Sequence, residues 1–231
     1  MHLHVKRADE SVTYELESGS ETLLALLEKI KTAQDASLSF ASDCRSSVCG
    51  SCAVRVNGVE VLACAHKPQD GDTVEPLRNL PLIRDLVVDM DRALTCNTVA
   101  QAFSSTNSEN IKVSQTDEKL NELQSDCILC GACYSACPVY AVNENFIGPF
   151  ALTRSWRYVS DVREQDVADK INAIQKDGVW DCTLCNECVP VCPQGIAPKQ
   201  DIVMLRSKSG VLRHMDPNMF GGGGLDFGAV R

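Results

Sequence analysis

Two copies of one cysteine spacing constrain this chain more than any other feature. The pattern C-x2-C-x2-C-x3-C-P occurs at residues 127–138 and again at residues 182–193. This spacing is typical of segments that hold cubane iron-sulfur clusters. Its repetition predicts two 4Fe-4S clusters.

The position of the fourth cysteine in each run predicts how the ligands are shared. Three cysteines separated by two residues wrap one cluster face in a tight loop, whereas the fourth, beyond a turn, is better placed to reach a second cluster. We therefore expect crossed ligand sets. One set is Cys127, Cys130, Cys133 and the remote Cys192; the other is Cys182, Cys185, Cys188 and the remote Cys137.

A third cysteine group lies upstream, in the pattern C-x4-C-x2-C with one remote cysteine. This is the plant-type 2Fe-2S spacing. Gly50 and Ser51 are small enough to let backbone N–H groups approach the sulfurs. Zinc ligands usually come as two separated pairs, so this spacing favours a cluster over a structural zinc ion. The predicted ligands are Cys44, Cys49, Cys52 and Cys64.

The chain has 231 residues, 13 cysteines and a net charge of -9. The length allows two modest domains. Residues 1–7 do not resemble a secretion signal, so we expect metal ligation in a reducing compartment rather than disulfides. The charge argues against a nucleic-acid surface, and no apolar run reaches the roughly 20 residues needed to cross a bilayer. We expect a soluble protein that docks to something else if it works at a membrane.

Local patterns predict an α+β fold. Residues 3–5 and 12–16 form a hairpin, a helix begins near residue 21, and a second hairpin turns at Asn57-Gly58. Residues 70–76 predict a turn, and residues 81–90 predict the start of a helix. The remaining predictions are helices near residues 117–123, 151–159, 166–174 and 198–206, with a Gly-rich tail at residues 221–224.

The polar stretch 104–110 predicts a domain boundary. Residues 1–103 would form a plant-type ferredoxin domain, similar to a β-grasp. Residues 104–231 would form a mostly α-helical, duplicated bacterial-ferredoxin domain whose stability depends largely on cluster ligation.

This order of motifs resembles the iron-sulfur subunit of succinate dehydrogenases and fumarate reductases. The resemblance covers roughly residues 5–204 and includes four strings besides the cysteine spacings: CGSCA at 49–53, LIRDLVVDM at 82–90, NFIGP at 145–149 and CPQGI at 192–196. It implies an electron-transfer subunit without a substrate site or catalytic residue of its own. The implied partners are a flavoprotein subunit that holds FAD and a quinone- or thiol-reactive subunit. The implied location is the cytoplasmic face of the cell membrane, reached through partner subunits.

Four positions depart from the usual family pattern. Cys185 completes a set that in most members lacks one cysteine and holds a 3Fe-4S cluster, so here a second 4Fe-4S cluster is expected. Thr183 and Val142 stand where quinone-reducing relatives have histidine and tryptophan. The complete set resembles the methylmenaquinol:fumarate and thiol:fumarate reductases, whose partner carries cysteine-rich CCG repeats. Ser47 stands where the family usually has glycine, and the sequence alone does not predict what this change does.

Other residues have ordinary interpretations. We expect Cys96 to be a buried small hydrophobe. His66 could replace a ligand as in Rieske centres, but four cysteines already complete the set, so we expect it to be a local hydrogen-bonding or surface residue. Arg45 is expected to be a solvated charge and Trp180 a packing residue. The alternative functions are a free-standing multi-cluster ferredoxin, an iron-sulfur subunit of another flavin oxidoreductase, and an iron or oxygen sensor.

Overall fold

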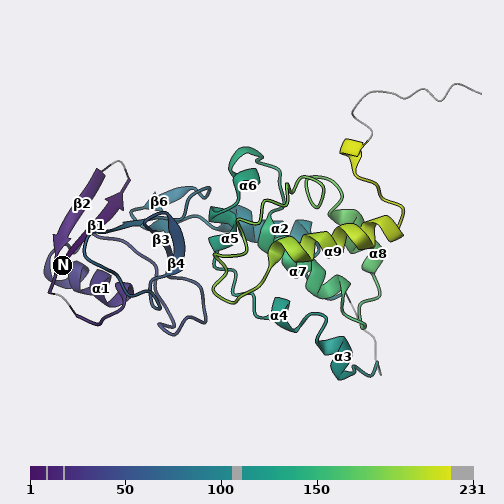
Figure 1. The fold of residues 1–231 in the computed structure, drawn as a ribbon, viewed down its shortest axis with the longest axis horizontal. Coiled ribbons are helices and arrows are strands. Elements are labelled where there is room, and N and C mark those ends of the chain that lie inside the picture. Colours follow the sequence, from purple (N-terminus) through teal and green to yellow (C-terminus); the bar gives the residue numbers. More distant parts are fainter. Residues whose placement is uncertain (9, 18, 106–110, 220–231) are drawn as a thin grey trace, which may run out of the picture.

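In a computed structural model, described for residues 1–8, 10–17, 19–105 and 111–219, the chain forms two adjoining halves. Figure 1 shows the strands and α1 gathered in the half that contains the N-terminus, and α2 through α9 in the other. The tail at 221–224 and residues 106–110 of the expected boundary lie outside the described residues. Among those described, no helix is both long and apolar enough to span a membrane.

The first half is built on a five-stranded sheet in the order β2-β1-β5-β3-β4. The strands are β1 His2–Arg7, β2 Glu10–Glu15, β3 Ala53–Val56, β4 Val59–Leu62 and β5 Asp72–Glu75. The two predicted hairpins are present as the antiparallel pairs β1/β2 and β3/β4. Asn57 has the positive φ of 49° that a two-residue hairpin turn requires.

Helix α1, Leu23–Ala33, confirms the predicted amphipathic helix. The hydroxyl of Thr22 accepts a hydrogen bond from the Ala25 N–H and caps its N-terminus. Its apolar side chains join those of the sheet in one core. The helix residues in this core are Leu23, Leu24, Leu27 and Ile30, and Leu26 is buried as well.

Two local predictions in this half are wrong. Residues 70–76 do not form a simple turn, because β5 lies in the sheet, parallel to β1 and antiparallel to β3. Residues 81–90 do not begin a helix: β6 Leu82–Arg84 and β7 Val87–Val88 pair as a small hairpin. Asp85 turns that hairpin with φ 48°, which a helix does not allow.

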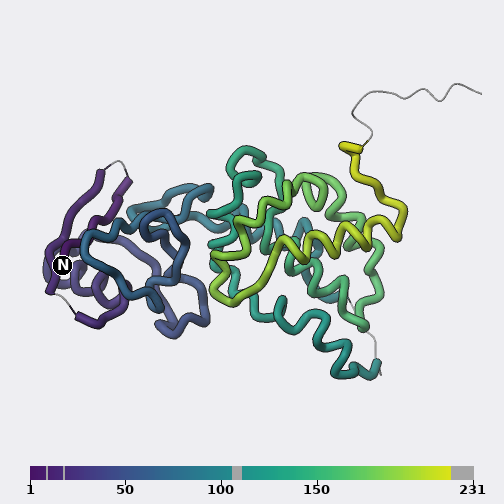
Figure 2. Tube along the Cα trace, in the orientation of Figure 1, coloured from purple at the N-terminus to yellow at the C-terminus, as the bar shows by residue number. Residues whose placement is uncertain are grey.

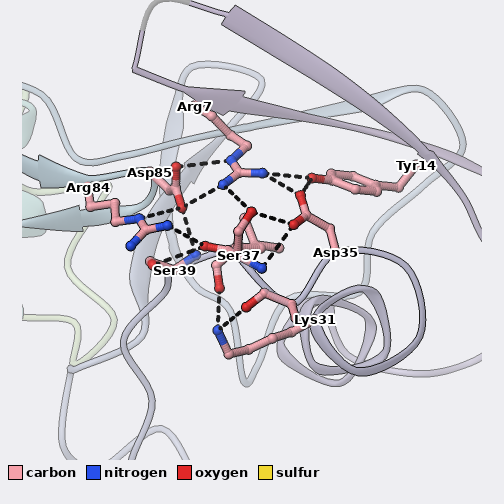
Figure 3. Close-up of polar contacts among 10 residues, drawn as sticks. Arg7, Tyr14, Lys31, Asp35, Ser37, Ser39, Arg84 and Asp85 are labelled. Atoms are coloured by element: carbon pink, nitrogen blue, oxygen red, sulfur yellow. Dashed lines mark hydrogen bonds and ion pairs between the residues drawn. The ribbon is translucent and has the colours of Figure 1, made fainter.

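Arg7 explains why the hairpin turns at Asp85 (Figure 3). Its guanidinium donates to both Asp85 oxygens, at 3.0 and 3.2 Å, and also to the Asp35 carboxylate. The Ser39 N–H donates to Asp85 at 2.8 Å. The β6/β7 hairpin is thus bound to β1 and to the segment that follows α1.

The second half is helical, as predicted. Its elements are α2 Asp91–Val99, α3 Gln115–Glu118, α4 Glu122–Ser125, α5 Ala132–Ser135, α6 Pro138–Val142, α7 Pro149–Val159, α8 Val167–Ala173, α9 Pro198–Val211 and the 3-10 turn η1 Pro217–Met219. The helix expected near residues 117–123 is divided into the short α3 and α4. Helices α7 and α9 pack along each other, and α2 and α8 also contact α7 (Figure 1).

A buried lysine fixes the segment that follows α2. Lys170 on α8 is fully buried, and its Nζ donates to the carbonyls of Gln101 (3.2 Å) and Phe103 (2.7 Å). The Glu164 carboxylate lies 3.5 Å from the same Nζ and accepts hydrogen bonds from Ser105. These contacts attach the segment after α2, residues 101–105, to α8 and the turn before it.

Candidate metal centres

The first site is the loop that carries Cys44, Cys49 and Cys52. The N–H groups of Ser46, Val48 and Cys49 donate to the Cys44 sulfur at 3.4, 3.4 and 3.3 Å. Residues 45, 47 and 50 have positive φ, which turns the backbone so that its amides face inward. Amide donors around sulfur favour an anionic centre.

The β3/β4 hairpin brings Cys64 to this loop, as predicted. The Cys64 N–H donates to the Cys52 sulfur at 3.5 Å, and the Ser47 N–H donates to the Cys64 sulfur at 3.3 Å. The Ser51 hydroxyl donates to the Cys49 sulfur at 3.3 Å. Hydrogen bonds therefore link Cys44 with Cys49 and Cys52 with Cys64, and Cys49 interacts electrostatically with Cys52. Their donor surroundings fit a 2Fe-2S cluster.

The second site is a cavity with an apolar lining between the two cysteine runs. Phe150 and Ile196 are among its other wall residues. Three of its cysteines come from the first run and one from the second. They are Cys127, Cys130, Cys133 and Cys192.

The third site has the reciprocal composition. The first run ends with Pro138, which begins α6, and the Cys137 sulfur caps that helix by accepting the Tyr140 N–H at 3.4 Å. This bend leaves Cys137 facing the second run. The cysteines that line the third cavity are Cys137, Cys182, Cys185 and Cys188.

The protonation chemistry of these thiols fits metal ligation. Burial raises the pKa of Cys130 to about 11 and that of Cys188 to about 12, and it raises the pKa of Cys133 well above its usual value. Unaided thiols in these cavities would stay protonated, and binding to iron supplies the positive charge that stabilises thiolates. All 13 cysteines are free of disulfides. Four thiolates around a cluster of several irons need not converge on one point, and no three His, Cys, Asp or Glu side chains of the described ranges converge on a single ion.

The three sites follow one another in space. Gly50 of the first loop lies against Cys130 of the second site, where a Cβ on Gly50 would be 2.7 Å from the Cys130 Cβ. The second and third sites share both runs. Tyr134, which follows Cys133 in the sequence, packs its ring edge to face against that of Tyr140, with 4.5 Å between the ring centres. Figure 2 shows the second run, in light green, returning toward the boundary between the two halves.

Helix α9 places unlike charges near the two cubane sites. Asp201 is buried, accepts hydrogen bonds from Gln124 (2.7 Å) and Thr153 (2.8 Å), and has its pKa raised to about 6 by burial. Arg206 donates to the Cys182 carbonyl at 2.6 Å, beside the third site. Neither residue was predicted from the sequence. The position of Asp201 next to Ile202, on the apolar face of a predicted helix, could have indicated a buried carboxylate.

The remaining candidates take ordinary positions. His66 lies 3.6 Å from Asp72, but its buried Nε2 has no hydrogen-bond partner among the described residues, so the expected side-chain hydrogen bond is not seen there. Arg45 forms an exposed ion pair with Glu28 at 2.7 Å. Cys96 is half-buried on α2 and packs against the core. The Trp180 indole N–H donates to Gln175 at 2.9 Å, and the Arg206 guanidinium lies 5.3 Å from its ring centre.

Two domain families match this chain. Residues 3–95 match the 2Fe-2S iron-sulfur cluster binding domain, and residues 123–196 match the 4Fe-4S dicluster domain. The match of the first family continues beyond the sheet into α2.

Curated relatives match across both halves. The chain is 35% identical over 202 residues to the 8-methylmenaquinol:fumarate reductase iron-sulfur subunit of Wolinella succinogenes, covering 81% of this chain and 63% of that subunit. It is 40% identical over 183 residues to the fumarate reductase iron-sulfur subunit of Mycobacterium tuberculosis, covering 74% of each. A chain of the Mycobacterium smegmatis Sdh1 complex in the apo form has a TM-score of 0.81 at 25% identity, with 94% of this chain and 97% of that chain covered.

Proposed function

This chain belongs to the family of iron-sulfur subunits of fumarate reductases and succinate dehydrogenases, and we propose from that membership that it carries single electrons between two partner subunits. One partner is a flavoprotein that holds FAD. The other reacts with a quinone or a thiol. The chain itself has no substrate site in this proposal.

The observation that carries the proposal is the crossed composition of the two cubane cavities. Each cavity takes three cysteines from one run and the last cysteine from the other run. This is the sharing found in two-cluster ferredoxins. The proposed ligands of the 2Fe-2S cluster are Cys44, Cys49, Cys52 and Cys64; those of the first 4Fe-4S cluster are Cys127, Cys130, Cys133 and Cys192; those of the second are Cys137, Cys182, Cys185 and Cys188.

Bound iron-sulfur clusters accept and release one electron each, whereas a flavin takes electrons in pairs. The chain's own residues hold three such sites in series and turn amide donors toward their sulfurs. Each of the three sites has a buried cysteine, and the first and third sites also have an exposed residue that a partner could contact. These exposed residues are Val48 in the first loop and Cys185 at the third site. The proposed flavoprotein contact is at the first loop, and the proposed second partner is at the third site.

The complete third site supports a methylmenaquinol- or thiol-linked complex. Cys185 supplies the fourth thiol of its cavity, so a 4Fe-4S cluster is proposed there. The Wolinella relative is named an 8-methylmenaquinol:fumarate reductase subunit. On these grounds we propose a subunit of the CCG-repeat type as the second partner, rather than a membrane anchor of another kind. That partner would hold this chain at the cytoplasmic face of the membrane.

The test is anaerobic purification of the tagged chain from cells that express it with its neighbouring genes. We expect a flavin-containing subunit to co-purify, about ten irons and ten inorganic sulfides per copy of this chain, and cluster reduction on addition of succinate. A chain that purifies alone, with full iron content but no response to succinate, would favour a free-standing ferredoxin. Stoichiometric zinc would contradict the cluster assignment.

A further inference from the structure

Ser47 directs two hydrogen-bond donors at one sulfur. Its N–H lies 3.3 Å from the Cys64 Sγ, and its hydroxyl oxygen lies 3.6 Å from the same atom. A cysteine bound to iron has lost its proton, so the hydroxyl must be the donor in the loaded site. The neighbouring Ser46 differs, because its hydroxyl donates to the Cys44 carbonyl rather than to a sulfur.

The Ser47 hydroxyl adds to the stabilisation of negative charge at Cys64. The reduced form of a cluster is more negative than the oxidised form, so a donor to a ligand sulfur stabilises the reduced form more. Loss of the hydroxyl therefore lowers the reduction potential.

The orientation of Ser47 is fixed from the other half of the chain. Ser47 has a φ of 60°, which is unfavourable for a residue with a Cβ. The Gln194 side-chain amide donates to the Ser47 carbonyl at 3.2 Å. Gln194 follows Cys192 by two residues, so this bond joins the loop of the first site to that of the second.

We propose that Ser47 is a positioning residue that raises the reduction potential of the 2Fe-2S cluster by donating to Cys64, and that Gln194 holds Ser47 in the donating orientation. The proposal rests on Cys64 being a ligand of that cluster, as proposed above. If this is so, the reduction potential of the first site depends on the position of the two halves of the chain relative to each other.

The test is a redox titration of the full-length chain with its clusters, followed by electron paramagnetic resonance of the reduced 2Fe-2S cluster. Ser47→Ala removes the hydroxyl, and Ser47→Gly removes it while also relieving the unfavourable φ. We expect both to shift the one-electron equilibrium toward the oxidised form by up to about tenfold, which is ~59 mV. Ser42→Ala, at an exposed position just before the loop, is the matched control and should leave the midpoint unchanged.

Gln194→Ala tests the support from the second half. We expect a smaller shift in the same direction, and we expect that shift to shrink in the Ser47→Gly background, because no hydroxyl is left to orient. Gln200→Ala, at an exposed position on α9, is the matched control. A Gln194 effect of equal size in both backgrounds would overturn its positioning role.

The outcomes separate this proposal from the proposed function. If the unaltered chain gives no 2Fe-2S signal, the ligand assignment fails. If that signal is present and both Ser47 variants keep the original midpoint, only the role of Ser47 fails. Loss of the signal in both variants also overturns the proposal, because a donor that only adjusts the potential is not needed to bind the cluster. If only the Ser47→Ala variant loses the 2Fe-2S signal, the midpoint of the Ser47→Gly variant decides whether the proposal stands.

Discussion

Gly50 lies so close to Cys130 that a Cβ on Gly50 would be 2.7 Å from the Cys130 Cβ and 3.0 Å from its Cα. This contact joins the 2Fe-2S loop to the first cubane site. It leaves no room for a side chain, and Gly50 also has a φ of 76°. The spacing between two proposed electron carriers thus depends on one residue having no side chain.

Gly50→Ala should therefore lower the free energy of unfolding by more than the backbone strain of a positive φ alone would. Gly71→Ala is the matched control, because Gly71 has a φ of 84° but nothing within 4 Å of an added Cβ. We expect Gly71→Ala to lower the free energy of unfolding by about 1–2 kcal/mol, and Gly50→Ala by roughly 1–3 kcal/mol more. Anaerobic thermal unfolding followed by circular dichroism measures both. If both variants lose the same stability, the structure around Cys130 can make room for the added methyl group with no loss of free energy.

Replacing Lys170 should also lower the free energy of unfolding strongly. Lys170→Met leaves the Glu164 carboxylate buried without its cation and two carbonyls without their donor, so we expect a loss of about 3–5 kcal/mol. Lys176→Met is the control, because its side chain is 92% exposed and its ion pair with Asp177 should contribute little. Chemical denaturation of the anaerobic protein gives both values. A loss below about 1 kcal/mol for Lys170→Met would show that water replaces the lysine.

Asp201 predicts a pH dependence of stability. Burial raises its pKa in the folded chain to about 6, above the ordinary value of 3.8 for an aspartate. A raised pKa favours the protonated folded form, so this contribution is complete below pH 3.8 and is lost as the pH rises through about 6. The change corresponds to at most about 3 kcal/mol. Asp201→Asn should remove this slope, since Thr153 can accept from the new amide. If the slope from pH 4 to 7 persists in that variant, another group causes it.

Asp85 predicts the opposite slope. Burial opposes its ionisation, but the hydrogen bonds from Arg7 hold its pKa below the usual range. A lowered pKa contributes stability above pH 3.8 that is lost as the pH falls further. Arg7→Met leaves two carboxylates without their partner and should cost about 3–5 kcal/mol at neutral pH, measured by denaturant unfolding. An Arg7→Met protein that unfolds like the unaltered one at neutral pH would show that this network does not hold the β6/β7 hairpin.

The sequence predicted those parts of the protein that depend on short segments. Cysteine spacing, the Asn57-Gly58 turn and the apolar face of α1 are local, and each has one common structural outcome. The strand β5 could not be recognised in the same way. It is short, flanked by Gly71 and Pro76, and pairs in parallel with a strand about 70 residues earlier.

The helix predicted to begin at residues 81–90 was wrong for a different reason. Their apolar residues also fit a helical period, but the buried Asp85 turns the chain because Arg7, far away in sequence, binds its carboxylate. Ser47 is similar. Its contact with Cys64 depends on the hairpin that returns Cys64, and its contact with Gln194 spans 147 positions of sequence. Long-range partners of this kind leave no local pattern.

The crossed ligand sets are tested most directly by comparing cysteine variants in pairs. Electron paramagnetic resonance and iron content would be measured anaerobically for Cys130→Ser, Cys192→Ser, Cys185→Ser and Cys137→Ser. We predict that Cys192→Ser changes the same cluster signal as Cys130→Ser, and that Cys137→Ser changes the same signal as Cys185→Ser, with the 2Fe-2S signal intact in all four. If Cys192→Ser instead matches Cys185→Ser, each run ligates its own cluster and the account of the two cubane sites is wrong.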